Sequence, residues 1–511
     1  MKQATLFYTS DTHSYLFPTN YIDEEIRPMG LMQASLLFEK DGNTLVLDGG
    51  DTLQGSALAK YVQDHKPAFL PQATVFNAAR YDCIVPGNHD FNYGYDMLLQ
   101  FFDQVEATVL CANVTDKDDR LAMLPHRIVT LENGLRIGLV GILTDYVSLW
   151  EKPENLQNLI IEDAFNCAKK ELDQIKPLCD LTLCIYHGGY EEDLNTGKIL
   201  TETKENIACK IARELSYDIL LCAHQHMEVP GQYLSGTYTL QLPAMATKVA
   251  RISIYQDDEG SLDISSSVLY TPVSPPSPLQ KKFQDLEADV QHWLSSSAGN
   301  IPSSIVPQTK LHNALQGSRI ADFFNQIQLD ISKADISCTS LGNNNPGFSS
   351  KITIRQIIAA YQFPNTLVVL EVDGQILKLA LERCASYFSI KEGKVAINKE
   401  FLIPKIEHYN YDYYAGLAYS FDLRRPIGER VTRLLYQGEP LGTKKLNLCM
   451  NNYRATGTGG YQFFRSCPIV KVINEDVQDL SVDWLQQHPD ATSWQKPDFT
   501  VITPETEVGI G

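Results

Sequence analysis

The sequence has no long hydrophobic run. No segment approaches the roughly 18 consecutive apolar residues that a membrane-spanning helix requires, and Met1 is followed almost at once by a strand-like run at 4–8 instead of an apolar leader. We therefore expect no membrane partner and, for the chain as given, a cytoplasmic location. Removal of a signal before this numbering begins would instead place the protein outside the cell or in the cell envelope.

Paired cysteines are also missing. The eleven cysteines are scattered singly, without a C-x-x-C pair. Cys184 and Cys222 lie in apolar runs typical of strands, and we interpret them as buried thiols. A reducing compartment is the simplest explanation of this cysteine usage.

Clusters of basic residues are lacking as well. The chain carries a formal net charge of -19, and no Lys/Arg run is long enough for a nucleic-acid footprint. This balance argues against a nucleic-acid polymer as a partner, but it is compatible with a single nucleotide bound in a local pocket. The length of 511 residues predicts two or three domains.

The chain up to about residue 255 alternates short apolar runs with helical segments, which is typical of an α/β layer structure. Apolar residues spaced three and four apart predict helices at 30–39, 93–104 and 161–175. The turn Glu132-Asn133-Gly134 between two apolar runs predicts a hairpin, so the sheets are not expected to be wholly parallel. The predicted strands are 4–8, 44–47, 82–85, 108–112, 181–186 and 219–223.

A Pro/Ser-rich segment at 271–278 breaks both periodicities. We therefore expect a first domain at 1–270, a linker with a connecting helix at 271–300, and a smaller α/β domain with a wrapping tail at 301–511. In the second domain the pattern predicts helices at 318–331 and 375–387 and strands at 335–337 and 366–372.

Polar residues follow five predicted strands of the first domain where each strand ends. The carboxyl ends of neighbouring strands in an α/β sheet form a common crevice, so these side chains are expected to converge. Taken singly, Asp11 is equally explained as a turn cap, Asp51 as a helix N-cap and His187 as a buried structural histidine. The converging set is Asp11, His13, Asp51, Asn88, His89, His187, His224 and His226.

Taken together, these residues offer oxygen and imidazole donors without a thiolate. Such donors suit two borderline divalent cations, namely zinc, manganese, iron or cobalt, and do not suit a calcium cage or a structural zinc site. Glycines at 49, 50, 87, 188 and 189 allow the backbone to turn sharply beside them. We therefore predict a metal site at these strand ends.

The order of these motifs resembles the calcineurin-like metallophosphoesterase superfamily: Asp-x-His at 11–13, Gly-Asp at 50–51, Gly-Asn-His-Asp at 87–90, then His187 and His-x-His at 224–226. In the second domain, three further motifs resemble the bacterial 5′-nucleotidase and 2′,3′-cyclic-nucleotide 2′-phosphodiesterase family. They are Phe-Pro-Asn-Thr at 363–366, Leu-Glu-Val-Asp-Gly-Gln at 370–375 and Asn-Asn-Tyr-Arg-Ala at 451–455. The resemblance implies a four-layer α/β/β/α metallophosphoesterase domain and a smaller α/β nucleotidase domain.

The resemblance also implies how two metals are held. One cation is bound by Asp11, His13 and His226, the other by Asn88, His187 and His224, and Asp51 bridges them. A bridging carboxylate suits two cations about 3.5 to 4 Å apart.

The resemblance leaves His89 without a metal, and it implies that His89 stabilises the developing charge or protonates the leaving alkoxide. The alternative is a structural pair with Asp90. The 5′-nucleotidases usually carry an Asp three residues after this His, where the chain has Asn92. An amide can orient the ring but cannot stabilise an imidazolium as a carboxylate does. The run Asn92-Tyr93-Gly94 is instead similar to the cyclic-nucleotide phosphodiesterase and 3′-nucleotidase branch.

The second domain is implied to bind the nucleoside. Phe363 and Tyr453 match the two aromatic positions that sandwich the base in the family, and Asn365 would add a polar contact. Ordinary core packing is the alternative for both aromatic residues. The chain departs from the family at 341–347, where the Gly-rich turn lacks its Arg, and at 456–460, where the acidic residue after the last Gly-rich turn is replaced.

These inferences predict a dinuclear phosphoesterase that hydrolyses nucleotides, with 2′,3′-cyclic nucleotides and 3′-nucleotides preferred over 5′-nucleotides. No covalent phosphoenzyme is expected, because no Ser, Cys or Asp is left free beside a base. A second hypothesis changes the substrate to a sugar phosphate, a nucleotide sugar or a sulfur ester. A third is a catalytically silent nucleotide-binding module.

Overall fold

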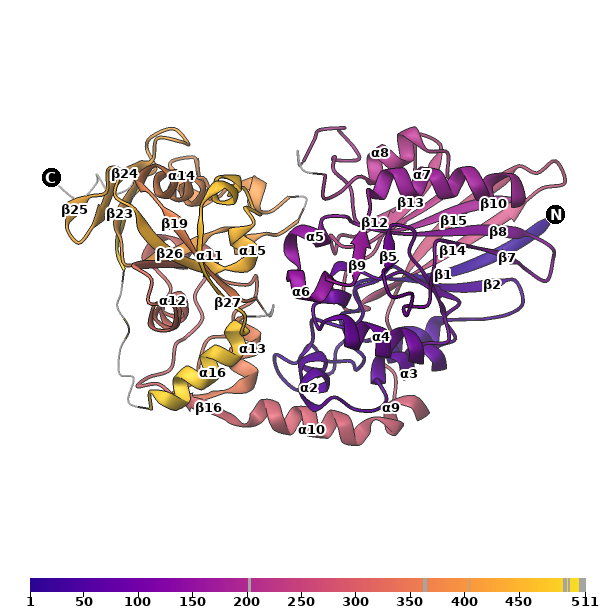
Figure 1. Cartoon of the computed structure of the whole chain (residues 1–511), viewed down its shortest axis with the longest axis horizontal. Coiled ribbons are helices and arrows are strands. Elements are labelled where there is room, and N and C mark those ends of the chain that lie inside the picture. Colours follow the sequence, from indigo (N-terminus) through magenta and orange to yellow (C-terminus); the bar gives the residue numbers. More distant parts are fainter. Residues whose placement is uncertain (201–203, 362–364, 404, 490–493, 495–496, 505–511) are drawn as a thin grey trace. The chain divides into compact units, whose positions relative to one another are not determined.

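The computed structural model describes residues 1–200, 204–361, 365–403, 405–489, 494 and 497–504 (Figure 1). It divides the chain into two compact units, unit 1 at Met1–Gln291 and unit 2 at His292–Gly511. Of the segment predicted as a linker, 271–291 belongs to unit 1 and 292–300 to unit 2. No helix among the described residues is both long enough and apolar enough to cross a membrane.

Unit 1 is built on two mixed sheets. In spatial order the first sheet comprises β15 (Leu262–Tyr270), β14 (Lys248–Gln256), β1 (Lys2–Thr9), β2 (Thr44–Asp48), β3 (Cys83–Ile84), β4 (Thr108–Leu110) and β6 (Met123–Leu124). The strands β1, β2, β3 and β4 run parallel, whereas β14 pairs antiparallel with β1 and places Lys2 opposite Gln256.

In spatial order the second sheet comprises β12 (Val229–Leu234), β13 (Thr237–Gln241), β11 (Ile219–Cys222), β10 (Leu181–His187), β8 (Arg136–Leu143) and β7 (His126–Thr130). The strands β8, β10, β11 and β13 are parallel. The predicted hairpin is confirmed, because β7 and β8 pair antiparallel around Glu132-Asn133-Gly134. A separate short ribbon joins β5 (Val114–Asp116) to β9 (Leu159–Ile161).

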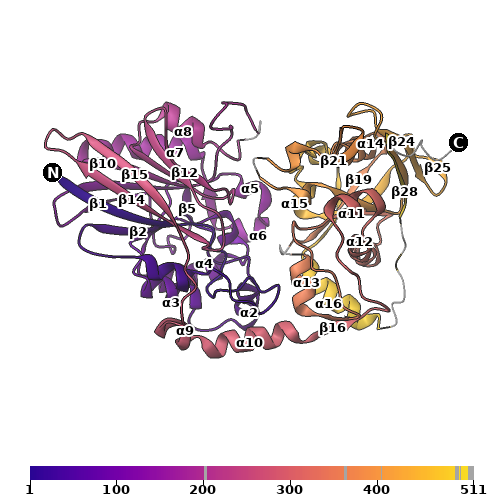
Figure 2. The ribbon, with the colours of Figure 1, turned by 180° about the vertical axis from the view of Figure 1, so that it is seen from behind.

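Side chains alternate between the two faces of each sheet in unit 1, and both faces are covered, which gives four layers. Leu183 and Ile185 of β10 face a core shared with the first sheet, whereas Cys184 and Tyr186 face helices on the opposite side. Both faces of the sheet are therefore apolar, as expected for buried parallel strands. The predicted α/β/β/α arrangement is confirmed, with α7 and α8 covering the second sheet and α3 and α4 covering the first (Figures 1 and 2).

The helices of unit 1 are α1 (Leu31–Ala34), α2 (Ala57–His65), α3 (Pro71–Ala78), α4 (Tyr95–Gln104), α5 (Val147–Trp150), α6 (Pro153–Leu156), α7 (Ala164–Ile175), α8 (Ala208–Glu214) and α9 (Pro278–Lys282), and α10 (Gln284–Ser295) continues into unit 2.

Two helices differ from the sequence prediction. The segment predicted as a helix at 30–39 is a single α-turn followed by a 3₁₀ turn, and the backbone becomes extended at Phe38. The N–H groups of Leu31 and Met32, which have no partner within the helix, bond to the carbonyls of Tyr15 and Leu16 and tie the start of this segment to an earlier loop. The connecting helix expected after the Pro/Ser run is interrupted at Phe283 between α9 and α10.

Unit 2 has its own core. Its main sheet comprises β22 (Asp412–Ala415), β17 (Ile336–Ser340), β26 (Leu446–Asn451), β19 (Leu367–Val372) and β27 (Ile469–Ile473). A second sheet comprises β25 (Glu439–Pro440), β24 (Val431–Tyr436), β23 (Ala418–Asp422) and β28 (Asp498–Ile502). Two ribbons pair β16 (Ser297–Asn300) with β18 (Lys351–Thr353) and β20 (Phe388–Lys391) with β21 (Lys394–Ile397).

The helices of unit 2 are α11 (Lys310–Gln316), α12 (Arg319–Ser332), α13 (Ile354–Ala360), α14 (Gly374–Ala385), α15 (Asn452–Ala455) and α16 (Val477–Gln487). Side-chain caps fix two helix starts, since Ser318 accepts the N–H of Ala321 and Asp373 accepts that of Ile376. In the tail, α16 contacts α12 and α13, and β28 adds a parallel strand to β23.

All eleven cysteines are free thiols. The two that the sequence predicted to be buried, Cys184 and Cys222, are fully enclosed in unit 1, and burial raises the pKa of the Cys222 thiol to about 12. A thiol with so high a pKa is not nucleophilic near neutral pH, so these residues serve packing.

Candidate metal centre

Five strand ends of unit 1, from both sheets, place polar side chains in one region. Asp11 and His13 follow β1, and Asp51 follows β2. Asn88 and His89 open the 3₁₀ turn Asn88–Phe91 after β3. In the second sheet, His187 is the last residue of β10, and His224 and His226 follow β11.

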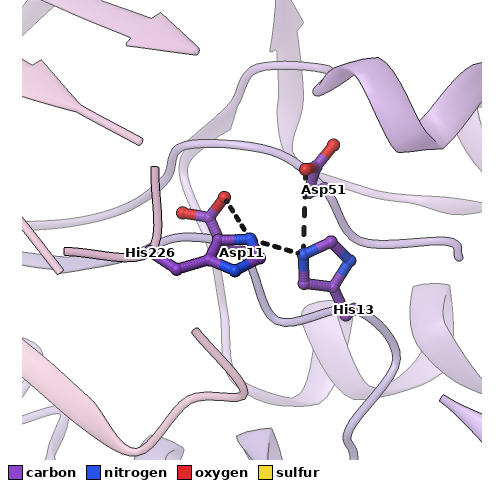
Figure 3. A group of neighbouring side chains, drawn as sticks. All are labelled: Asp11, His13, Asp51 and His226. Carbon is purple, nitrogen blue, oxygen red and sulfur yellow. Dashed lines mark hydrogen bonds and ion pairs between the residues drawn. The ribbon is translucent and has the colours of Figure 1, made fainter. Parts of the chain in front are cut away.

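The first group of donors consists of Asp11, His13, Asp51 and His226, whose ligand atoms lie within 4.8 Å of one another (Figure 3). The Nε2 atoms of His13 and His226 are 2.9 Å apart. His226 Nε2 lies 3.5 Å from Asp11 Oδ1, and His13 Nε2 lies 3.8 Å from Asp51 Oδ2. The four side chains therefore converge from three separate loops.

The second group consists of Asp51, His187 and His224, again within 4.8 Å. His187 Nε2 lies 3.3 Å from Asp51 Oδ2 and 3.1 Å from the side-chain oxygen of Asn88. Asn88 thus joins this group through a carbonyl oxygen. Asp51 belongs to both groups, and this shared carboxylate can face two cations.

In three of the histidines, one ring nitrogen contacts a carbonyl or carboxylate oxygen that fixes the orientation of the ring. His13 Nδ1 lies 2.7 Å from the carbonyl of Gln54, and His187 Nδ1 lies 2.6 Å from the carbonyl of Gly49. A carbonyl only accepts, so each Nδ1 carries the hydrogen and each Nε2 is left to bind a cation. His224 has its Nε2 3.1 Å from a carboxylate oxygen of Glu205.

Two buried carboxylate oxygens without hydrogen-bond partners among the described residues indicate that this region fits a cation. Asp11 Oδ2 and Asp51 Oδ2 have no hydrogen-bond partner in the part of the chain that the structure describes, although both residues are completely buried. A buried oxygen without a partner is costly unless a cation or a donor satisfies it. These oxygens and the imidazole nitrogens are donors that divalent zinc, manganese, iron and cobalt accept.

The titration of the cluster follows from burial and mutual charge. Burial raises the pKa of Asp11, with Asp51 adding to the effect. Burial lowers the pKa of His13. Burial also disfavours a charged His187, but the carboxylates of Asp51 and Asp11 outweigh it and raise the pKa of His187 to about 9. Without a cation, one imidazolium therefore neutralises part of the carboxylate charge.

The backbone of the site is strained. Asp11, His13, Asp51, His224 and His226 all have positive φ, between 49° and 73°. Each such conformation costs about 1 to 3 kcal/mol for a residue other than glycine and persists only where surrounding contacts hold it. Here the amides of Asp11 and His13 bond to the carbonyls of Gly50 and Asp51 (2.8 and 2.7 Å), which lock the first two loops together.

Asp90 holds the second and third loops together. Its carboxylate accepts four backbone N–H groups, from Asp51 and Gly87 on one oxygen and from Thr52 and Leu53 on the other, at 2.7 to 3.1 Å. Gly87 packs directly against Asp51: a Cβ at position 87 would lie only 2.2 Å from Asp51 Oδ1. Asp90 therefore positions Asp51 without entering either donor group.

His89 lies at the edge of the first group, with its ring centroid 5.3 Å from that of His13. Its backbone N–H donates to Asp51 Oδ1 (2.8 Å), and its Nδ1 lies 2.7 Å from Asn92 Oδ1. Asn92 Nδ2 in turn donates to Glu151 Oε2 (2.5 Å). The predicted pair of His89 and Asn92 is thus in direct contact.

The residues predicted to bind a nucleoside lie in unit 2, except that Phe363 is outside the described residues. Tyr453 is half-buried on α15, which the buried ion pair of Arg454 and Asp412 (2.8 Å) anchors to β22. Asn365 is also half-buried. Burial raises the pKa of Tyr361, while the side chains of Asn451 and Asn365 bond to its hydroxyl.

Two carboxylates of this site were not singled out from the sequence. Asp90 was considered only as a structural partner of His89, whereas its carboxylate accepts backbone N–H groups of two loops. Glu151 and Glu205 belong to no motif, and they reach the site from segments 59 and 19 residues away from their partners Asn92 and His224. Only the fold brings them there.

Two family models match the chain. The calcineurin-like phosphoesterase model matches residues 5–228, and the model of the 5′-nucleotidase C-terminal domain matches residues 298–466. The first match spans every residue of the two donor groups.

Three relatives are similar to this chain over most of its length. A Staphylococcus aureus protein provisionally assigned as a 5′-nucleotidase, solved in complex with alpha-ketoglutarate, is 30% identical, with 98% of this chain and 100% of that one covered and a TM-score of 0.91. The trifunctional nucleotide phosphoesterase YfkN of Bacillus subtilis is 23% identical over 94% of this chain, which spans only 38% of its length.

A 2′,3′-cyclic-nucleotide 2′-phosphodiesterase/3′-nucleotidase of Haemophilus influenzae is 24% identical over 88% of this chain and 79% of that protein. The chain therefore belongs to the calcineurin-like phosphoesterases that carry a 5′-nucleotidase C-terminal domain, a family of metal-dependent hydrolases.

Proposed function

We propose that this protein hydrolyses nucleotide phosphoesters with two divalent cations, and that 2′,3′-cyclic nucleotides and 3′-nucleotides are preferred over 5′-nucleotides. The observation that carries the proposal is the pair of donor groups that share Asp51. A single carboxylate common to two groups supports two neighbouring cations, the arrangement used for in-line displacement at phosphorus.

The division of ligands is part of the proposal. Asp11, His13 and His226 would hold one cation, Asn88, His187 and His224 the other, and Asp51 would bridge them. Such cations supply Lewis-acid stabilisation of phosphoryl oxygens and a lowered pKa for a nearby water. The carbonyls of Gln54 and Gly49 hold Nδ1 of His13 and His187, so that the Nε2 atoms of both rings would be available to the cations.

His89 would then act on the substrate directly. Its backbone is tied to Asp51, so the ring is placed beside the donor groups without belonging to either. With Nδ1 bonded to Asn92, Nε2 is the ring nitrogen that would stabilise the developing phosphoryl charge or give a proton to the leaving alkoxide.

The preference among nucleotides is supported by Asn92 and by the relatives. Asn92-Tyr93-Gly94 occupies the position where 5′-nucleotidases usually have Asp. The Haemophilus relative, described as a cyclic-nucleotide phosphodiesterase and 3′-nucleotidase, aligns over 88% of the chain. We infer that the substrate is a 2′,3′-cyclic nucleotide opened to a 3′-nucleotide, which is then cleaved to nucleoside and phosphate.

A substrate panel tests the proposal. Protein loaded with manganese should release product from 2′,3′-cyclic nucleotides and 3′-nucleotides with a kcat/KM at least about tenfold above that for 5′-nucleotides, a difference of about 1.4 kcal/mol in transition-state binding. Equal or higher kcat/KM for 5′-nucleotides would refute the preference. No turnover of any nucleotide, cyclic or linear, would refute the function.

Nucleoside binding by unit 2 has a separate test. If Tyr453 stacks on the base, Tyr453→Ala should raise KM by about 5- to 150-fold, because base stacking is worth about 1 to 3 kcal/mol, and should leave kcat nearly unchanged. Tyr453→Phe is the matched control, since it keeps the ring. Unchanged KM in the Ala variant would point to a substrate without a base, such as a sugar phosphate.

A further inference from the structure

A chain of two hydrogen bonds connects His89 to a carboxylate that no motif contains. His89 Nδ1 contacts Asn92 Oδ1 at 2.7 Å, and Asn92 Nδ2 donates to Glu151 Oε2 at 2.5 Å. Asn92 directly follows the 3₁₀ turn that carries His89, whereas Glu151 directly follows α5, in a different part of unit 1. The carboxylate that is absent at position 92 is thus present one hydrogen bond further away.

Glu151 is itself held firmly. The residue is only 9% exposed, and its other side-chain oxygen, Oε1, accepts the backbone N–H of Lys152 (2.7 Å) and an N–H of Asn155 Nδ2 (2.8 Å). Asn155 also donates to the carbonyl of Asn92 (3.2 Å). The carboxylate therefore cannot rotate away from Asn92 without losing two bonds.

This arrangement leaves Asn92 one orientation. An ionised carboxylate only accepts hydrogen bonds, so Asn92 must present Nδ2 to Glu151 and Oδ1 to His89. Because Oδ1 also only accepts, the hydrogen of the neutral His89 ring must be on Nδ1. In the neutral ring, Nε2 is then the nitrogen without a hydrogen. The donor role that the proposed function gives to Nε2 therefore belongs to the doubly protonated ring, whose Nδ1–H still bonds to Asn92 Oδ1.

We infer that Glu151 is a positioning residue for hydrolysis: through the Asn92 amide it fixes the ring orientation of His89 and the nitrogen that carries its hydrogen. The inference rests on the proposed function for the role of His89. A neutral amide alone would leave both orientations of Asn92 open, and with them both tautomers of His89.

Glu151→Gln tests the inference with an isosteric change. The two donors at Oε1 keep the Gln oxygen on their side, so the Gln NH₂ group faces Asn92 and turns its amide over. His89 then has to accept at Nδ1, and its neutral ring carries the hydrogen on Nε2. The doubly protonated ring, which donates to the substrate, is disfavoured because its Nδ1–H would face the Asn92 NH₂ group. We expect kcat for a 2′,3′-cyclic nucleotide to fall by about 10- to 100-fold, with KM within twofold and metal content unchanged. Glu154→Gln, on the exposed side of α6, is the matched control and should leave both constants unchanged.

A compensating variant separates positioning from a merely structural contact. When Asn92→Asp is combined with Glu151→Gln, the introduced carboxylate accepts from His89 Nδ1 and from the Gln NH₂ group, so we expect most of the lost kcat to return. Asn92→Asp alone sets two carboxylates against each other and should be less active than the double variant. In ¹⁵N-histidine-labelled protein, the neutral His89 ring should carry its hydrogen on Nδ1 in the wild type and on Nε2 in Glu151→Gln.

Wild-type kcat in Glu151→Gln, or a double variant no more active than Glu151→Gln, would overturn the inference. If Glu151→Gln does not fold, Glu151→Asp keeps the acceptor, and it must retain Nδ1–H of His89 for the inference to stand. A wild-type protein that cleaves no nucleotide would refute the proposed function instead, and the ¹⁵N measurement would still decide which nitrogen of His89 carries the hydrogen.

Discussion

At the scale of single residues, His89 is held by two bonds of different kinds. Its backbone N–H supports Asp51, whereas its ring is oriented by Asn92. Removing the ring therefore leaves the support of Asp51 in place. The two roles of this residue can be separated experimentally for that reason.

His89→Ala should lower kcat by about 10²- to 10⁴-fold, the usual contribution of a positioned proton donor, while both cations remain bound. Nucleotide turnover and metal analysis on the same sample measure both effects. His65→Ala is the control, because His65 is exposed at the end of α2 and should change neither quantity. Loss of metal together with activity would show that the ring is needed for the metal site.

The charge state of His187 predicts how metal binding depends on pH. The pKa of His187 in the cation-free site is about 9, raised by Asp51 and Asp11 against the effect of burial, so this ring is protonated at pH 7.5. A ligand imidazole must be neutral. Metal affinity should therefore rise with pH up to about 9, and above that pH His187 should contribute no further increase.

Calorimetry in two buffers measures this exchange. At pH 7.5, zinc binding should release at least one proton, so the apparent heat should differ between buffers that have different ionisation enthalpies. Equal heats in the two buffers would contradict the assignment of a raised pKa to His187.

At the scale of elements, the site is a set of strand-end loops joined by a central carboxylate. Asp90 accepts N–H groups from the loop after β2 and from the loop after β3. Burial and the neighbouring charge of Asp51 raise the pKa of Asp90 to about 6. Above that pH the carboxylate can accept all four bonds.

Asp90→Asn should destabilise the protein, because an amide has only one accepting atom and two buried N–H groups would face its NH₂ group. Each unsatisfied group costs about 1 to 3 kcal/mol, so the free energy of unfolding should fall by on the order of 2 to 6 kcal/mol in urea titration. The control is Asp193→Asn: Asp193 also accepts backbone N–H groups but in an exposed loop. An equal loss in both variants would exclude the proposed role of Asp90.

How much of the metal centre the sequence predicts depends on how far apart in the sequence the contacting residues lie. The strand ends that carry Asp11, Asp51 and His187 were predictable, since apolar runs mark the strands and parallel strands share an edge. The end of the helix expected at 30–39 was not: the α-turn begins at Leu31, but it gives way to a 3₁₀ turn at Ser35 and the backbone is extended at Phe38.

The carboxylates that contact Asn92 and His224 could not be predicted from the sequence either, because their partners are distant along the chain. Glu151 reaches Asn92, and Glu205 reaches His224, only through tertiary packing. The separation in sequence between each carboxylate and its partner matches no helix or turn spacing, so the sequence does not signal the contact. Five of the predicted ligands have positive φ, which the sequence did not predict because residues other than glycine normally avoid that conformation.

At the scale of the whole molecule, the two units have separate cores, and both donor groups lie in unit 1. A cation that binds only the folded state stabilises it by about 2.7 kcal/mol at a concentration one hundred times its Kd. That stabilisation belongs to the unit that holds the site.

Scanning calorimetry should therefore show a transition that chelation lowers by on the order of 5 °C and a second transition, from unit 2, that chelation leaves unchanged. Restoring manganese should return the first transition to its original temperature. A single transition that chelation lowers as a whole would show that the units unfold as one.

The pairing of β1 with β14 also affects how the protein is made. The amino-terminal strand places Lys2 opposite Gln256, so one edge of β1 has no partner until that part of the chain leaves the ribosome. At a synthesis rate of about 5 to 20 residues per second, this takes roughly 13 to 50 s. Through that interval the nascent chain presents an open strand edge, and this is the stage at which a chaperone would protect it most.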